Sequence, residues 1–172
     1  MTPRARARAR LCPARDAGAQ FFNEKLCKLC LTWLGDDVHS IRVAATNNLR
    51  RLTELFGLDW AQAFIIPRIA DMYGDANYLQ RMTALYAVQV LADALHSELV
   101  QEEVLPALLT MASDPVPNIR FNVAKTLEKL APRVGPEVVS AEIAPCLSHL
   151  VETDADRDVK YFARCALRTI AA

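Results

Sequence analysis

The chain has 172 residues, of which 52% are hydrophobic and 23% are charged, with 20 Lys and Arg against 20 Asp and Glu. This length suits one domain or a short repeat array with a sizeable core, and the composition excludes general disorder. No apolar run reaches the roughly 18 residues that a membrane-spanning helix needs, so no membrane partner is expected. The zero net charge conceals a basic start, residues 1–18, and a mildly acidic remainder. An acidic remainder argues against a nucleic-acid surface.

The basic start, residues 1–19, is expected to be a disordered leader outside the fold. Arg4, Arg6, Arg8 and Arg10 alternate with Ala and have no aromatic residue among them. This pattern favours a solvated tail over a mitochondrial presequence or an arm that binds nucleic acid or lipid. Five cysteines without framework spacing, and no secretory signal, indicate reduced thiols in a cytoplasmic protein, with the nucleus as a second compartment.

Beyond the leader, apolar residues recur at helical spacing and predict eight helices. In chain order these cover residues 20–34, 39–56, 59–74, 77–96, 98–113, 116–131, 136–152 and 156–171. Gly, Asp, Asn and Pro cluster after the first helix of each pair, which predicts short turns there. No stretch alternates apolar and polar residues for long enough to predict a strand.

Three series of residues repeat with a common period of 39 or 40 residues. Pro67, Pro106 and Pro145 form the first series. The other two run in parallel, with Asp36, Asp75, Asp114 and Asp154 each six positions before Arg42, Arg81, Arg120 and Lys160. The shared period predicts an all-α solenoid of four HEAT repeats, with units at 20–57, 58–97, 98–135 and 136–172. Each proline is expected to bend its helix, because it cannot donate to the carbonyl four residues earlier.

The acidic and basic series are expected to form a ladder between units. The Asp in each turn can cap the second helix, and the basic residue six positions later projects toward the Asp of a neighbouring unit. Charge-assisted hydrogen bonds along the stack would fix the register between units. The alternative is a set of solvated surface charges.

Several segments resemble one family more closely than this architecture requires. They are Phe21–Leu26, Trp33–Leu34, Ile41–Leu49, Asp75–Thr83, Asp114–Lys125 and Asp158–Ala163. From about residue 20 to the end, the chain resembles the scaffolding A subunit of protein phosphatase 2A over its last four HEAT repeats. The first 19 residues do not share this resemblance.

The resemblance implies a non-catalytic scaffold whose turns bind the catalytic subunit of a Ser/Thr protein phosphatase of the 2A type. It implies that His39, Tyr78 and Val116 face that subunit, with His39 in place of the family's Tyr. The regulatory subunit is not expected to bind this short form, because the resemblance does not include the N-terminal repeats that hold it. The residues themselves favour Tyr78 as an exposed interface anchor, and the two prolines around Val116 are expected to hold its side chain outward.

Two other functional hypotheses remain open. A free-standing HEAT adaptor would bind a peptide or cargo protein in its concave groove, through its helices rather than its turns. A nucleic-acid or organelle protein directed by the Arg-rich leader would depend on residues 1–18 and not on the repeats.

No catalytic, metal-binding or cofactor-binding pattern is found, so neither an enzyme nor a cofactor is expected. Cys27 and Cys30 form a C-x-x-C pair, but they lack the second pair of a zinc site and the strand–helix junction of a redox centre. His39, His96 and His149 lie in different units without a nucleophile and carboxylate pattern.

The first helix of the array carries an apolar face that no preceding unit covers. Phe21, Leu26 and Trp33 lie on this face. Terminal repeats need a polar outer surface. The chain is therefore expected to self-associate or to fray at this end.

Overall fold

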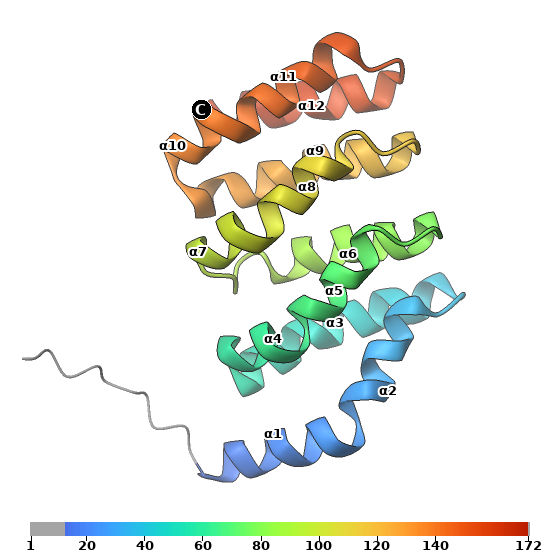
Figure 1. The fold of residues 1–172 in the computed structure, drawn as a ribbon, viewed down its shortest axis with the longest axis vertical. Helices are drawn as coiled ribbons and strands as arrows, with labels where there is room; N and C mark the ends of the chain where they lie inside the picture. Colours follow the sequence, from blue (N-terminus) through green and yellow to red (C-terminus); the bar gives the residue numbers. More distant parts are fainter. Residues whose placement is uncertain (1–12, 172) are drawn as a thin grey trace, which may run out of the picture.

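The computed structural model describes residues 13–171, and all regular elements in that range are helical. Figure 1 shows the helices stacked in pairs along the long axis, in two layers. One layer holds the second helices of units 1–4, which are α3 (His39–Phe56), α6 (Tyr78–Leu91), α9 (Pro117–Val134) and α12 (Arg157–Ile170). The structure therefore confirms the predicted all-α solenoid of four helix pairs.

The other layer holds the first helices, each of which is divided into segments. Unit 1 contains α1 (Pro13–Lys25), α2 (Cys27–Thr32) and the 3₁₀ turn η1 (Trp33–Gly35), and unit 2 contains α4 (Leu58–Phe64) and α5 (Ile66–Tyr73). Unit 3 contains α7 (Ser97–Leu99), the π turn η2 (Val100–Val104) and α8 (Leu105–Met111). Unit 4 contains α10 (Pro136–Val138), the π turn η3 (Val139–Ile143) and α11 (Ala144–Thr153).

Three boundaries differ from the sequence prediction by three residues or more. Helix α1 begins at Pro13, so residues 13–19, expected in the disordered leader, are helical. The rest of that leader lies outside the described residues. Helix α6 ends at Leu91, before the predicted 96, whereas α9 continues through the exposed Pro132 to Val134. Helix α9 ends there because Gly135 has φ 85°, a conformation that only glycine adopts without strain.

The interruption of the first helix occurs at the same repeat position in every unit. Leu26, Ile65, Val104 and Ile143 mark it, at intervals of 39 residues. In units 3 and 4 the turn that precedes the proline widens into a π turn, which accommodates a residue without an N–H. In unit 1 Lys28 stands where the prolines stand, yet the helix is still interrupted at Leu26, where φ is −122°. The interruption therefore belongs to the repeat as well as to the proline.

A continuous apolar core fills the space between the layers. The four marker positions differ in how well the stack covers the core at each unit. Ile65, Val104 and Ile143 are at most 1% exposed, whereas Leu26 is 42% exposed. Phe21, Leu29 and Trp33 are also exposed in unit 1. The uncovered apolar face predicted for the first helix is thus present in the fold. Within the described range, no helix has both the length and the hydropathy to cross a bilayer.

Candidate partner-binding surface

The turns between first and second helices line one edge of the stack and share one local geometry. We call residues 36–38, 74–77, 112–116 and 154–156 the ridge of turns (Figure 1). In each turn an Asp Oδ1 accepts a hydrogen bond from the backbone N–H two residues later. The four bonds are Asp36 to Val38 (2.8 Å), Asp75 to Asn77 (2.7 Å), Asp114 to Val116 (2.8 Å) and Asp154 to Asp156 (2.8 Å).

These bonds refine the predicted capping role of the Asp series. Each Asp holds the residue that precedes the second helix and does not bond to the helix itself. In units 2 and 4 a second polar residue caps the helix directly, since Asn77 accepts from the N–H of Leu79 and Asp156 accepts from the N–H groups of Asp158 and Val159.

The side chains of the arginine series donate hydrogen bonds to backbone carbonyls of the same turns. The Nη1 atoms of Arg42, Arg81 and Arg120 donate to the carbonyl oxygen six residues earlier, at 2.7–2.8 Å. Each also donates to the next carbonyl, at 3.0–3.3 Å. Every one of these three turns is therefore held by an Asp side chain and by an Arg side chain.

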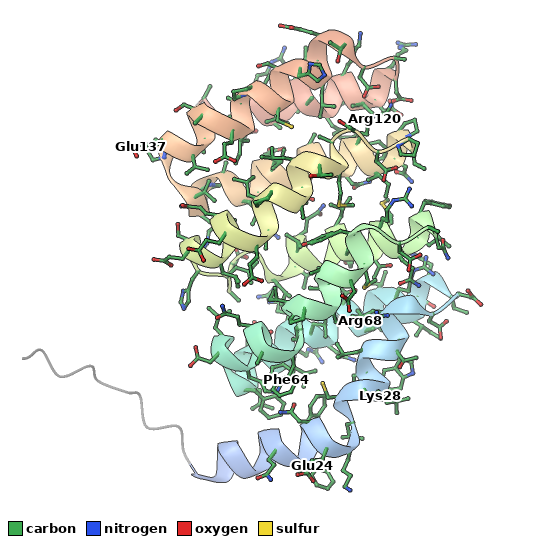
Figure 2. The ribbon with its side chains drawn as sticks, viewed as in Figure 1. Glu24, Lys28, Phe64, Arg68, Arg120 and Glu137 are labelled. Carbon is green, nitrogen blue, oxygen red and sulfur yellow. The ribbon has the colours of Figure 1, made fainter. Side chains whose placement is uncertain are left out.

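Two of these arginines also reach the next unit. Arg81 donates to Asp114 through Nε at 2.6 Å and Nη2 at 3.0 Å, and Arg120 donates to Asp154 at 2.6 and 2.8 Å. Figure 2 shows Arg120 at the edge of the stack where the turns lie. The hydrogen bond with Arg120 holds the pKa of the Asp154 carboxyl below its usual value, and the nearby charge of Lys160 acts in the same direction. The same bond raises the pKa of Arg120.

The predicted ladder lacks its first rung. Among the described residues, no ion pair joins Arg42 to Asp75, whose side chain is exposed. Instead, Gln80 crosses this junction, and its Nε2 donates to the carbonyl of Gly35 at 3.1 Å. An added Cβ at Gly35 would lie 2.8 Å from that Nε2 atom, so a larger residue there would displace the end of the Gln80 side chain. The Asp–Arg pairing is therefore a property of two junctions out of three.

The three residues expected to face the phosphatase catalytic subunit differ in exposure. His39 and Tyr78 are the first residues of α3 and α6, and both are exposed, Tyr78 by 43%. Val116 is half-buried and packs against the core, so its side chain is not held outward as expected. Val38, at the same repeat position as Val116 in unit 1, is 52% exposed instead. The spacing of 78 residues, two repeat periods, could have identified it.

The C-x-x-C pair lies away from this ridge, within α2. Cys27 is buried and Cys30 half-buried, and burial raises the pKa of both thiols. Protonated thiols are poor nucleophiles and poor metal ligands. Over residues 13–171, no group of three or more His, Cys, Asp or Glu side chains could hold a metal ion.

Comparisons with known proteins agree with this architecture. The profile of the HEAT-repeat family matches residues 66–168. The chain is 42% identical to the regulatory A subunit of protein phosphatase PP2A from Saccharomyces cerevisiae, over 69% of this chain and 20% of that protein. It is 48% identical to the Schizosaccharomyces pombe protein of the same name, over 40% of this chain and 12% of the relative. The resemblance identified from the sequence is confirmed, and the chain spans a fifth or less of these relatives.

Solved structures support the fold alone. A designed armadillo repeat protein matches with a TM-score of 0.54 over 90% of this chain and 68% of that chain, at 18% sequence identity. Such low identity carries no functional information, but the match shows that the helix pairs stack as in other solenoids.

Proposed function

We propose, from the premise that the chain belongs to the HEAT-repeat family, that its ridge of turns binds the catalytic subunit of a 2A-type Ser/Thr protein phosphatase. The similar proteins are regulatory A subunits of that phosphatase, which supports a non-catalytic scaffold role. The observation that carries the proposal is the exposed pair His39 and Tyr78, which occupy equivalent positions directly after two adjacent, doubly held turns of the ridge.

The rigidity of the turns suits this role. Each of the turns before α3, α6 and α9 is fixed by an Asp-to-backbone bond and by Arg-to-carbonyl bonds. A side chain on such a turn loses little conformational entropy when a partner binds. Tyr78 offers a large contact area with a polar tip, which is typical of an interface anchor.

The charge of the ridge indicates what the partner surface must supply. Asp37 and Asp75 are exposed beside the two aromatic side chains. A partner that covers Tyr78 must therefore bring basic or hydrogen-bond-donating groups to these carboxylates, because a buried and unpaired charge is costly.

We also propose that these four units do not bind a regulatory subunit by themselves. The resemblance is to the last four repeats of the scaffolding protein, whereas that family holds its regulatory subunits on the N-terminal repeats. Affinity capture from a lysate should then recover the phosphatase catalytic subunit without a regulatory subunit. Recovery of both in equal amounts would contradict this second proposal.

The direct test is the affinity for purified catalytic subunit, measured by surface plasmon resonance. Tyr78→Ala should weaken binding by about 1–3 kcal/mol, since the removed ring is an exposed anchor. The matched control is Tyr86→Ala, because Tyr86 is 38% exposed on the same helix but lies about two turns away from the ridge. Equal affinities for wild type and Tyr78→Ala would refute the assignment of the ridge.

A further inference from the structure

Apart from the first helix of unit 1, the two layers of the solenoid carry opposite charge. The second helices α3, α6, α9 and α12 contain 12 Lys or Arg and three Asp or Glu. The first helices of units 2–4, residues 58–73, 97–111 and 136–153, contain one basic and eight acidic residues. The chain as a whole has no net charge, so the basic excess on the second helices is balanced by acidic residues elsewhere in the chain.

The basic charges that the ladder does not use are concentrated on α9 and α12. Lys125 and Lys129 lie four residues apart and therefore on one face of α9. Lys129 is exposed, and so is Arg168 on α12. Of the three ion pairs among the described residues, none includes Lys125, Lys129 or Arg168. Lys129 and Arg168 are therefore exposed and outside these ion pairs.

Aromatic rings join the two helices beneath these charges. The Nζ of Lys125 lies 3.9 Å from the centroid of Phe162 on α12 and 4.9 Å from that of Phe121 on α9. The two rings are 5.2 Å apart, and Tyr161 packs edge-on against Phe162 with 60% of its surface exposed. The surface is thus a cluster of tilted and edge-on rings with the Lys125 ammonium over two of them. Lys129 lies four residues after Lys125 on α9 and Arg168 lies seven residues after Tyr161 on α12, so each shares a helix face with this cluster. We call Phe121, Lys125, Lys129, Tyr161, Phe162 and Arg168 the basic platform.

The same face continues into unit 2 with an apolar character. The amide of Asn122 on α9 contacts the sulfur of Met82 on α6 at 3.6 Å. Met82, Leu79 and Tyr86 then line a groove between α6 and α3. Apolar and aromatic side chains of a bound segment would find contacts along this face.

We propose that the basic platform binds an acidic peptide segment that carries aromatic side chains. Complementary charge would attract the segment, and its rings would stack on Tyr161 and Phe162. A peptide is favoured over a nucleic acid because the groove that continues this face, along Leu79, Met82 and Tyr86, offers contacts to apolar side chains. His39 also lines this groove, but the basic platform itself includes neither His39 nor Tyr78, so the proposal does not rest on the function proposed above.

Fluorescence anisotropy on the full chain tests the proposal. The probe is a fluorescein-labelled 12-residue peptide of Glu with three Phe, and the comparison probes are the same peptide with Lys for Glu and a 12-nucleotide single-stranded DNA. Lys129→Glu/Arg168→Glu should weaken binding of the acidic peptide at least tenfold. The matched control Lys25→Glu/Lys28→Glu makes the same change in net charge on exposed residues at the opposite end of the stack (Figure 2) and should change binding less than twofold.

The Arg-rich leader is identical in all these variants, so it cannot produce a difference between them. Unchanged binding in Lys129→Glu/Arg168→Glu, an equal loss in the control, or tighter binding of the DNA than of the acidic peptide would each overturn the proposal. Thermal melting checks that the variants fold, and Lys129→Gln/Arg168→Gln replaces the reversal if it unfolds the chain. Affinity for the phosphatase catalytic subunit measured on the same variants separates this surface from the ridge of turns.

Discussion

The pair between Arg120 and Asp154 gives the sharpest test of how the units are held together. The carboxylate side chain is 4% exposed and the guanidinium 15%, and two hydrogen bonds of 2.6 and 2.8 Å join them. Arg120→Met removes these bonds and the bonds to the carbonyls of Asp114 and Pro115. Asp154 would keep the N–H of Asp156 and would otherwise be a buried charge without a partner.

Breaking a buried pair in this way costs about 3–5 kcal/mol. Because solvent still reaches the guanidinium, we expect the lower end, about 3 kcal/mol. For a chain of this size, each kcal/mol changes the melting temperature by about 2–4 °C, so Tm should fall by about 6–12 °C. Arg42→Met is the control, since it loses two carbonyl bonds but no bond to the next unit. Its expected cost is about 1–2 kcal/mol.

The pH dependence of the stability difference between wild type and Arg120→Met is a second readout. The bond with Arg120 lowers the pKa of Asp154 in the folded state. The contribution of this bond to the free energy of unfolding is therefore complete above the unfolded pKa of about 3.9, and it is lost as the pH falls through the folded pKa. The gap between wild type and Arg120→Met, measured by urea denaturation, should therefore narrow below about pH 4. Equal destabilisation by Arg42→Met and Arg120→Met, or a gap that does not change with pH, would refute the reasoning.

Two further predictions concern the ends of units. Phe21→Glu/Leu29→Glu places charges on side chains that are 60% and 50% exposed, and it should reduce self-association in analytical ultracentrifugation without a large change in Tm. A wild type that stays monomeric at high concentration would contradict this. Gly135→Ala forces a Cβ onto a residue with φ 85° and should cost about 1–3 kcal/mol in urea denaturation, although no neighbouring atom would clash with the added Cβ. Gly18→Ala is the control, because nothing lies near that position either and it is in helix α1.

Much of the architecture could be predicted because repetition encodes it directly. The shared period defined four units, and α3 spans residues 39–56 as predicted. The two Asp–Arg pairs between units, Arg81–Asp114 and Arg120–Asp154, follow from residues that recur at one repeat position along the chain. The missing first rung could not be predicted in this way, because Arg42 and Asp75 keep the phase of their series, and Gln80, which crosses this junction instead, has no counterpart one period away.

The candidate binding surfaces could be predicted less fully from the sequence than the fold, for two physical reasons. The side chain of Val116 turns toward the core, and the direction of a side chain on a turn depends on packing that the sequence does not state. The basic platform combines residues of α9 and α12 that are about 40 positions apart, so it emerges only when the two helices are known to lie side by side. The separation of charge between the layers was present in the sequence, but it required the helix pairs to be assigned first.

The repeated interruption at Leu26, Ile65, Val104 and Ile143 has a mechanical consequence. The turns at the ridge are braced by paired side chains, whereas the first helices depart from continuous α-helical structure at one level in every unit. When the molecule flexes, deformation should therefore be shared among these four aligned positions in the layer of first helices. The curvature of the array would then change while the Asp–Arg pairs keep the spacing of the turns in units 2–4.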